Sequence, residues 1–558
     1  MKTRKLLSLI MAVLMLLSLV PAAMADEQAV TTVTVYPPDA TTNSGNPPDY
    51  INQFFVEEGL DVQVWAYSPE KTNAILSSGD LPDVMYVTYK DLQTMIEGGM
   101  VLNLEEHIEK MPHVTGDPVI MTAVNYVRQF RSAETNQLWA IPALVNVQAE
   151  ADDTGRNAVK VRWDVFHAIG APDVEDVYDL IPIMKQMMEY MPVAKDGTKT
   201  WGTCLNSGTD SVHWRSIEQW YKWHGYEMDN LQFLLETDML NAQYTSILEA
   251  GRDSMYYKGL KFYNTCFREG VLDPDSINND RNTQKAKVET SNAIMIPAGS
   301  TPGWSNYRSI QVGDQGLYAE NWGSPYGGDM FFVINPKTEH LDACLKFIDM
   351  MADADLYFRM YNGTEEMGLW YTGEDGLVYP TELGFNQSVY PTGEGTFFST
   401  GEKPEVWLDR PVRSFTHSIS YIGPDGPRRA RGMSEWTEIK TARNATEENT
   451  QWVERYGYPT FTKMLKATDD YMLTSPLTSV SSFCTPVDEW TQLSLDALRD
   501  VMVTGSWKMV YAETDEEFEA IWDQMMKDCK ELGGEDIVNA RLADLANAKA
   551  IKDSLAAE

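Results

Sequence analysis

Aromatic residues in loop-like segments are the side chains of this sequence best suited to binding chemistry. Six of them occur near glycine, serine, proline or asparagine: Trp201, Trp214, Trp304, Trp322, Tyr326 and Trp370. A flat ring can stack on the apolar C–H face of a sugar while nearby Asp, Asn, Glu or Arg groups bond its hydroxyls. The alternative role of such a ring is core packing. We expect packing for Trp163, Trp220, Trp223 and Trp522, because they fall on helical or strand patterns.

A second group of candidates lies where predicted strands end. Tyr36 and Asp39 follow a predicted strand over residues 30–36, and Tyr86 ends another over residues 83–87. Ligands of open α/β sheets bind outside the carboxyl ends of the strands. We therefore add Tyr36, Asp39 and Tyr86 to the candidate ligand-binding residues, with an ordinary turn as the alternative role of Asp39.

Catalytic and metal-binding motifs are absent from the sequence. It contains no GxSxG, HExxH, GxxxxGK[ST] or intact GxGxxG pattern. Its seven histidines show no metal-ligand spacing, and residues 273–277 lack the third acidic position and the glycine of an EF-hand loop. We therefore predict a protein that is not an enzyme and that uses no cofactor or metal. A carboxylate pair for glycoside hydrolysis stays open among the 82 acidic residues.

The N-terminus has the pattern of a secretory signal peptide. Three basic residues precede an apolar run over residues 6–20, and the small-residue segment Ala23-Met24-Ala25 follows. The run is shorter than the roughly 20 residues that a membrane-spanning helix needs. We expect cleavage after Ala25 and a secreted protein at the extracellular face of the cell envelope.

Charge and size limit the partners and the architecture. Removal of residues 1–25 takes away three basic residues, which changes the net charge from −37 to −40. Such a surface repels nucleic acid and acidic membranes, so we expect neither as a partner. The remaining chain is longer than one hydrophobic core normally organises, and we expect at least two lobes.

The five cysteines are widely scattered and form no CxxC pattern. Cys266 and Cys344 fall on the apolar faces of helical patterns, which predicts buried free thiols.

The first hundred residues alternate between strand and helix patterns. We predict strands over residues 30–36, 60–67 and 83–87, and helices over residues 48–58 and 68–77. This alternation is typical of a parallel α/β sheet. Between the second helix and the third strand, Gly79 can adopt the left-handed geometry that ends a helix, and Pro82 cannot continue one.

Several segments resemble motifs of extracellular solute-binding protein family 1, the substrate-binding proteins of ABC importers. The resemblance is to the large oligosaccharide-binding type of Gram-positive bacteria. Ser78-Gly79-Asp80-Leu81-Pro82-Asp83 is similar to the family's turn between a helix and a strand. Further similar segments are residues 98–104, 136–142, 161–170, 256–274, 331–351, 361–371 and 504–534. One difference is that these relatives usually carry a lipidation cysteine at the end of the signal, whereas the first cysteine here is Cys204.

The resemblance implies a two-lobed periplasmic-binding-protein fold of type II, in which each lobe is a mixed sheet flanked by helices. Lobe 1 would comprise residues 26–142 and 328–360, and lobe 2 residues 143–327 and 361–558, with crossings near Pro142, Gly328 and Tyr361. The implied ligand is an oligosaccharide, which a monomer captures by hinge closure and delivers to the permease subunits of an ABC importer.

Two other functions stay open at this point. A secreted sensor or surface glycan-binding protein could use the same two lobes to present a ligand to a receptor. A glycan-active enzyme would need a pair of carboxylates in the cleft.

Overall fold

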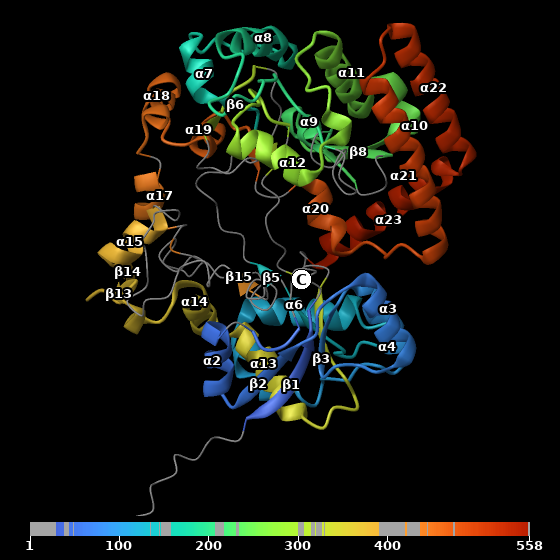
Figure 1. Cartoon of the computed structure of the whole chain (residues 1–558). Helices are drawn as coiled ribbons and strands as arrows, with labels where there is room; N and C mark the ends of the chain where they lie inside the picture. The colour runs from blue at the N-terminus through green and yellow to red at the C-terminus, as the bar shows by residue number, and fades with distance from the viewer. Residues whose placement is uncertain are drawn as a thin grey trace, which may run out of the picture. The chain divides into compact units, whose positions relative to one another are not determined.

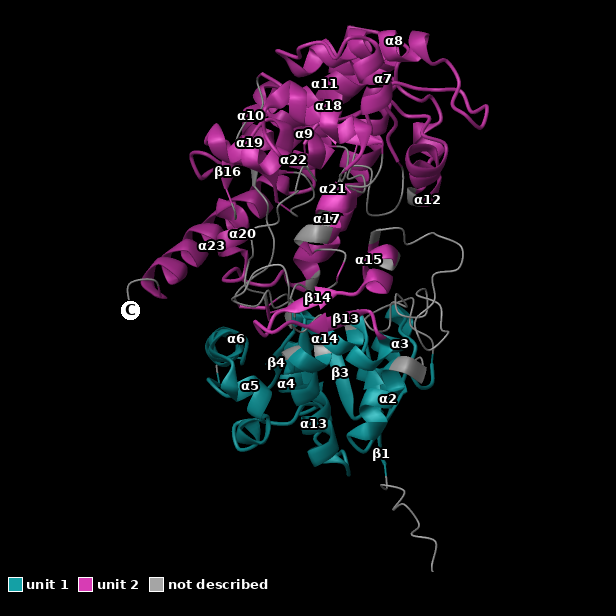
Figure 2. Cartoon of the chain, turned by 90° about the vertical axis from the view of Figure 1, so that its left-hand side faces the viewer, with its two compact units in different colours: residues 1–143, 330–367, 397–419 teal, residues 144–329, 368–396, 420–558 magenta. Residues whose placement is uncertain are grey.

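The structure is a computed structural model, coloured along the chain in Figure 1. It describes residues 30–37, 44–47, 49–133, 135–143, 145–146, 158–206, 217–229, 234–298, 306–313, 318–319, 326–327, 330–389, 419–420, 433, 436–443, 445–472 and 475–555. The chain divides into two compact units (Figure 2). Unit 1 comprises residues 1–143, 330–367 and 397–419, and unit 2 comprises residues 144–329, 368–396 and 420–558. The lobe boundaries proposed from the sequence remain predictions.

Unit 1 is built on a five-stranded sheet in the order β2-β1-β3-β12-β4. The strands are β1 (Thr31–Tyr36), β2 (Leu60–Val64), β3 (Val84–Val87), β12 (Phe331–Ile334) and β4 (Ile141–Pro142). β1 pairs in parallel with β2 and β3, whereas β12 runs antiparallel to β3 and β4. The carboxyl ends of β1, β2, β3 and β4 therefore share one edge of the sheet, which we call the carboxyl edge.

Helices flank this sheet, as the strand-helix alternation predicts. They are α2 (Asp49–Glu57), α3 (Pro69–Ser78), α4 (Tyr89–Glu97), η1 (Ile108–Lys110), α5 (Pro112–Gly116), α6 (Pro118–Phe130), α13 (Leu341–Ala352), α14 (Ala354–Asn362) and η8 (Glu365–Met367). α2 and α13 meet through Phe55 and Phe347, whose ring centroids lie 5.7 Å apart. The buried valines of β1 and β2 alternate with more exposed residues, so the core lies on one face of these strands.

The turn between α3 and β3 has the geometry predicted from its sequence. Gly79 is left-handed at φ 73°, and its N–H donates to the carbonyl of Ile75, which ends the helix. Five residues later the chain enters β3, whose residues are all buried. The sequence predicts a strand over residues 60–67, but in the structure β2 ends at Val64.

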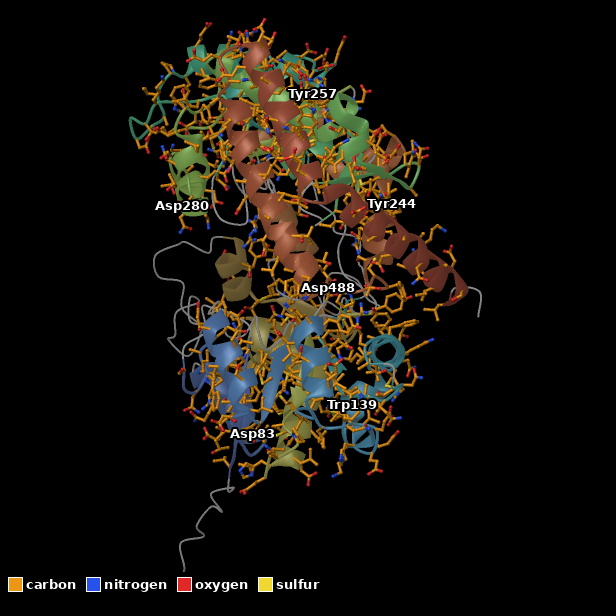
Figure 3. All side chains as sticks on the ribbon, turned by 90° about the vertical axis from the view of Figure 1, so that its right-hand side faces the viewer. Asp83, Trp139, Tyr244, Tyr257, Asp280 and Asp488 are labelled. Atoms are coloured by element: carbon orange, nitrogen blue, oxygen red, sulfur yellow. The ribbon has the colours of Figure 1, made fainter. Side chains whose placement is uncertain are left out.

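Asp83 joins three segments of unit 1 just before β3 (labelled in Figure 3). Its Oδ2 accepts hydrogen bonds from the Thr34 N–H at 2.9 Å and the Thr34 hydroxyl at 2.7 Å, and its Oδ1 accepts one from the Thr338 hydroxyl at 2.6 Å. Burial alone would raise the pKa of Asp83, but the hydrogen bonds from Thr338 and Thr34 outweigh it and lower the pKa. The ionised carboxylate thus ties β1 and β3 to the turn after β12.

Unit 2 contains short strands and a larger share of helix. A three-stranded antiparallel sheet consists of β7 (Tyr226–Met228), β8 (Leu235–Asp238) and β9 (Gln243–Ser246). The other strands are β5 (Val145–Asn146), β6 (Lys160–Arg162), β10 (Tyr307–Ser309), β11 (Tyr318–Ala319), β13 (Trp370–Thr372), β14 (Val378–Pro380), β15 (Ile419–Ser420) and β16 (Tyr471–Met472). Isolated bridges join Trp201 to Ile294 and Thr203 to Leu272, which extends the strand-like core of this unit.

The helices of unit 2 follow in sequence along the rest of the chain. They are α7 (Trp163–Ala168), η3 (Val177–Asp179), α8 (Leu180–Tyr190), α9 (Glu218–Trp223), α10 (Ile247–Ala250), η5 (Gly251–Asp253), α11 (Met255–Arg268), η6 (Ser276–Asn278), α12 (Arg281–Lys285), η7 (Ala286–Thr290), α15 (Glu382–Val389), α17 (Thr437–Arg443), α18 (Glu447–Tyr456), α19 (Phe461–Ala467), α20 (Pro476–Ser481), α21 (Glu489–Val510), α22 (Asp515–Glu531) and α23 (Gly534–Leu555). None of the helices in the described residues is long and apolar enough to cross a membrane.

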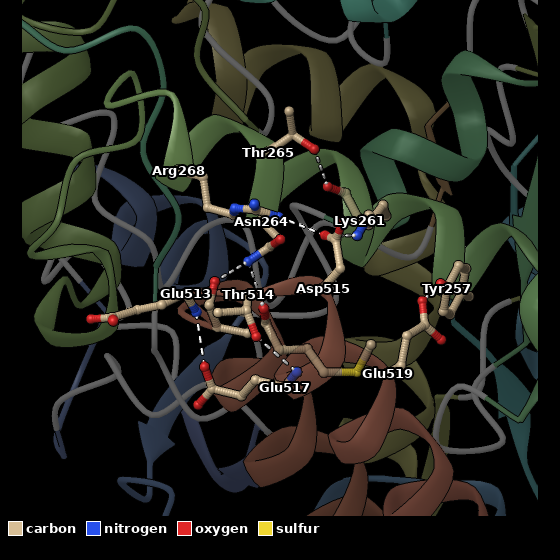
Figure 4. Close-up of polar contacts among 12 residues, drawn as sticks. Tyr257, Lys261, Asn264, Thr265, Arg268, Glu513, Thr514, Asp515, Glu517 and Glu519 are labelled. Carbon is tan, nitrogen blue, oxygen red and sulfur yellow. Dashed lines mark hydrogen bonds and ion pairs between the residues drawn. The ribbon is translucent and has the colours of Figure 1, made fainter.

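Polar contacts hold α11 against the turn between α21 and α22 (Figure 4). The buried Asn264 amide donates to the carbonyls of Met509, Val510 and Ala512. Asp515 pairs with Lys261 at 2.8 Å and with Arg268 at 2.6 Å. The capping-box motif formed by Thr514 and Glu517 at the start of α22 is present in part.

At that start, the Thr514 hydroxyl accepts from the Glu517 N–H, as a capping box requires. The Glu517 carboxylate, however, accepts from the N–H of Glu513 instead of that of Thr514. The second bond of the motif is therefore displaced by one residue.

Packing predictions for aromatic and sulfur side chains are confirmed. Trp163, Trp220, Trp223 and Trp522 are at most 2% exposed. All five cysteines are free and buried, including Cys266 and Cys344. Burial raises the pKa of each thiol, to about 12 for Cys204 and about 11 for Cys484.

We expect Asp83→Asn to lower the stability of unit 1 by about 2 kcal/mol at pH 7, because charge-assisted hydrogen bonds are lost. Since the pKa of Asp83 is lowered by folding, this difference should be present above the usual pKa of 3.8 and vanish as the pH falls below it. Calorimetric unfolding measures the change. Asp80→Asn, in the same turn but exposed, is the control, and equal losses in both variants would contradict the role of Asp83.

We also expect a pH-dependent loss of stability from Glu236 on β8. This 4% exposed carboxylate accepts hydrogen bonds from the Tyr221 hydroxyl and the Met255 N–H, yet burial raises its pKa to about 7. A raised pKa means that stability is fully present below the unfolded value of 4.5 and is lost as the pH rises through 7. Between pH 4.5 and 8, the wild type should therefore lose about 3 kcal/mol more than Glu236→Gln.

Denaturant titrations at several pH values measure this difference. The exposed Glu249→Gln on α10 serves as the control and should follow the wild type. Parallel pH profiles for wild type and Glu236→Gln would show that this carboxyl does not control the stability of the sheet.

Candidate ligand-binding edge of unit 1

The carboxyl edge of unit 1 gathers side chains from three parallel strands. The chain leaves β1 at Pro37, β2 at Trp65 and β3 at Thr88. β12 runs the other way, so Phe331 enters the sheet at this same edge. In open α/β sheets, ligands bind at this edge. The residues that follow the strands are therefore the first candidates for a site within unit 1.

The first group of these side chains surrounds the start of α3. Lys71 Nζ lies 5.0 Å from the ring centroid of Trp65 and 5.7 Å from that of Tyr36. The rings of Tyr36 and Tyr67 stand 5.8 Å apart at an angle of 40°. Trp65, Tyr67 and Lys71 are each half-buried, so part of each side chain faces solvent. The group therefore offers exposed ring faces beside a cation.

Tyr36 fixes the position of α3 relative to β1. Its hydroxyl donates to the carbonyl of Ser68 at 3.0 Å and exchanges a hydrogen bond with the Thr72 hydroxyl at 2.9 Å. Ser68 is the N-cap of α3 and accepts a hydrogen bond from the N–H of Lys71 at 3.1 Å. A single buried hydroxyl thus helps to hold the helix that carries Lys71.

A second group lies beyond β3. Thr88 caps α4 by accepting a hydrogen bond from the Asp91 N–H, and Tyr89 is the first residue of the helix. The Arg131 guanidinium carbon lies 4.1 Å from the ring centroid of Tyr89 and 5.2 Å from that of Tyr126. Cation–ring contacts of this kind contribute about 0.5–2 kcal/mol each. Both groups thus combine aromatic rings with a cation.

Burial keeps Tyr67 and Tyr86 in their neutral forms. Burial is the largest cause of a raised pKa at Tyr67, and the nearby Tyr36, Asp91 and Glu70 raise this pKa further. Tyr67 therefore remains a phenol that can both donate and accept a hydrogen bond at neutral pH. Burial also raises the pKa of Tyr86 far above its usual range.

The sequence-predicted residues of unit 1 lie at or beneath this edge. Tyr36 is 1% exposed, and Tyr86 is 5% exposed with its ring centroid 3.9 Å from that of Phe332. Both rings support the surface from below, and access by a ligand would require them to move. Asp39 lies outside the described residues. The ligand-binding roles of all three remain predictions.

The sequence-predicted residues of unit 2 occupy varied positions. Trp201 packs against a cluster of Cys204, Val288, Ile294 and Tyr307, with Lys199 Nζ 3.8 Å from its ring centroid. The half-buried Tyr326 meets the ring of Phe483 edge-on at 5.1 Å. Trp370 is 9% exposed at the start of β13. Trp214, Trp304 and Trp322 lie outside the described residues, and ligand contact by any of the six stays a prediction.

Sequence reasoning missed several residues of the carboxyl edge. Trp65 and Tyr67 were placed inside a predicted strand, but β2 ends before them and leaves both in the loop to α3. Lys71 and Arg131 lie on or after helices, where a basic residue normally indicates only a solvated face. The available signal was Ser68-Pro69, a helix start that limits the preceding strand.

The arrangement at the carboxyl edge favours noncovalent binding. Its groups are rings, hydroxyls and cations, which stack on a ligand and donate hydrogen bonds to it. In the part of the chain that the structure describes, no group of three or more His, Cys, Asp or Glu side chains could hold a metal ion.

Comparisons with known proteins give fold likenesses only. No protein-family model matches the sequence, and a search of curated proteins finds no match. The ABC-transporter substrate-binding protein FusA of S. pneumoniae, solved in complex with kestose, is 14% identical with a TM-score of 0.59. The match covers 94% of this chain and 100% of FusA.

Two solved structures from Bifidobacterium longum infantis are also similar. An HMO-binding, ABC-transporter-associated solute-binding protein is 12% identical with a TM-score of 0.54. The match covers 91% of this chain and 97% of the solved chain. An extracellular solute-binding protein is 12% identical with a TM-score of 0.57, and the match covers 93% of this chain and 98% of the solved chain. The predicted α/β fold, that of two-lobed periplasmic-binding-protein-like solute-binding proteins, is confirmed.

We expect Tyr36→Phe to lower the stability of unit 1 by about 1 kcal/mol, because the buried hydroxyl bonds to Ser68 and Thr72 are lost. Thermal unfolding of the ligand-free protein measures the shift. Tyr67→Phe removes a hydroxyl from the neighbouring ring and should leave stability within about 0.5 kcal/mol of the wild type. Unchanged unfolding of Tyr36→Phe would mean that this hydroxyl does not hold α3.

Proposed function

We propose that this chain is an extracellular solute-binding protein that captures an oligosaccharide for an ABC importer. The proposal includes membership of the large Gram-positive oligosaccharide-binding type. The observation that carries it is the fold likeness to FusA over 94% of this chain, in a structure with a bound saccharide. The half-exposed rings of Trp65, Tyr67 and Tyr89 at the carboxyl edge supply stacking surfaces for such a ligand.

The proposed mechanism is hinge closure of two lobes around the sugar. Stacking and hydrogen bonds made by both lobes would stabilise the closed form, and a membrane importer would distinguish it from the open form. In this proposal lobe 1 comprises residues 26–142 and 328–360, and lobe 2 residues 143–327 and 361–558. On unit 2, Trp370 and Tyr326 are the candidate ligand-binding rings among the described residues.

The remaining parts of the proposal concern location and partners. The signal peptide would be cleaved after Ala25, and the protein would act as a monomer at the outer face of the cell envelope. Permease subunits would receive the sugar without any covalent change to it. The similar solved structures are binding proteins of transporters, which supports a role without catalysis.

We expect the secreted form to be stabilised by one class of oligosaccharide. Thermal unfolding against fructo-, malto-, xylo- and galacto-oligosaccharides should show a shift equivalent to about 2.7 kcal/mol at a ligand concentration 100 times the Kd. Chromatography of the same mixtures checks for products. No shift with any sugar would overturn the proposal, and sugar cleavage would replace it with the glycan-active enzyme.

We expect Trp65→Ala to weaken sugar binding about tenfold, because a stacking face is lost from the carboxyl edge. Calorimetric titration measures the affinity. Trp139→Ala is the matched control, because this half-buried tryptophan lies two residues before β4, at the opposite edge of the sheet (labelled in Figure 3). Wild-type affinity in Trp65→Ala, or an equal loss in both variants, would exclude Trp65 from the site.

A further inference from the structure

Lys71 has an unusual electrostatic position for this chain. The sequence carries 82 acidic and 45 basic residues, and lysines such as Lys110, Lys185 and Lys346 form ion pairs with surface carboxylates. No carboxylate among the described residues lies within ion-pair distance of Lys71 Nζ, and its ammonium contacts the rings of Trp65 and Tyr36. Among the described residues, no hydrogen-bond acceptor for its three N–H donors is found.

The helix that carries Lys71 does not explain this charge. Lys71 is the third residue of α3, and cations are unfavourable in the first turn because they face the positive end of the helix dipole. Glu70 is the residue that suits this position. Hydrogen bonds from its own N–H and from Ser68 lower the pKa of Glu70, so its carboxylate is engaged with the helix start. Glu70 thus compensates the positive end of α3, and the charge of Lys71 is left without a structural role in the helix.

The surroundings of Lys71 indicate the shape of a suitable anion. The half-buried ring of Trp65 lies beside the cation, and the half-buried ring of Tyr67 packs against Tyr36, the second ring that Lys71 contacts. An isolated inorganic anion would leave these ring faces uncovered. A sugar ring bearing a carboxylate or sulfate would cover a ring face and bring its anionic oxygens to the ammonium group.

We propose that the carboxyl edge of unit 1 selects an acidic saccharide, whose anionic group accepts a hydrogen bond from Lys71 Nζ while its ring stacks on Trp65. This inference rests on the proposed function and specifies its substrate class. The shared chemistry is a compact anion on a sugar ring, and the source of the charge is a uronic acid or a sulfate ester. Attraction to Lys71 falls with ionic strength, since the side chain is partly exposed.

The test compares three ligands built on galactose-type rings. Oligogalacturonides carry carboxylates, carrageenan oligosaccharides carry sulfates, and galacto-oligosaccharides are neutral. Calorimetric titrations at low and high salt measure the affinity of the secreted wild-type protein for each. The variants are Lys71→Gln, Lys71→Arg and the control Lys337→Gln. Lys337 is exposed in the turn after β12, at the opposite edge of the same sheet, so its replacement removes the same charge from unit 1.

The proposal predicts that one acidic ligand binds at least tenfold more tightly than the neutral one at low salt. Lys71→Gln should lose at least tenfold in affinity for that ligand and most of the salt dependence, whereas Lys71→Arg and Lys337→Gln should stay near the wild type. Binding of the oligogalacturonide would identify carboxylate as the recognised group, and binding of the carrageenan oligosaccharide would identify sulfate. Equal losses in Lys71→Gln and Lys337→Gln would overturn the assignment of Lys71.

The same measurements distinguish failure of the acidic-saccharide proposal from failure of the proposed sugar-binding function. If neutral saccharides bind and acidic ones do not, the acidic class is wrong and the proposed sugar-binding function stands. If no saccharide of either kind stabilises the protein, both proposals are overturned together. The ligand-free unfolding temperature of each variant confirms that the comparison is made between folded proteins.

Discussion

The architecture of unit 1 depends on one carboxylate at the amino end of its central strand β3. Asp83 bonds Thr34 of β1 and Thr338 beyond β12, so it joins segments that lie 49 and 255 residues away in the chain. These bonds fix the start of β3 beside Val35 of β1. The register of the two strands in turn determines which residues follow them at the carboxyl edge. The candidate site therefore depends on the contacts made at the start of β3.

Local signals made much of unit 1 predictable. The turn at Gly79 followed from backbone chemistry, since glycine tolerates a left-handed conformation and Pro82 prevents the helix from continuing. In unit 2, helical or strand periodicity predicts the burial of tryptophans such as Trp163 and Trp522. The fold class followed from strand-helix alternation together with the order of several short motifs.

The candidate site was less predictable, because it depends on where strands end. The sequence around Trp65 is compatible with a strand that continues through it or stops before it. In the structure the pairing of β2 with β1 ends at Val64, which leaves Trp65 in the loop. Trp201 is the reverse case, because a residue predicted in a loop packs toward the core. Its glycine-rich context predicts a loop, but a bridge to Ile294 and packing against Tyr307 draw it toward the core. Tertiary pairing overrides local context in both cases.

The burial of all five cysteines has a consequence for how this chain must reach its native state. On the proposed secretion route the chain folds among oxidants, and its unfolded form would present five reactive thiols to them. In the native state the thiols have raised pKa values and little thiolate, so exchange and air oxidation are slow. Folding thus competes with wrong cross-linking, and the odd number of thiols leaves at least one for another molecule. The integrity of the hydrophobic core, rather than any disulfide, is the safeguard against covalent aggregation.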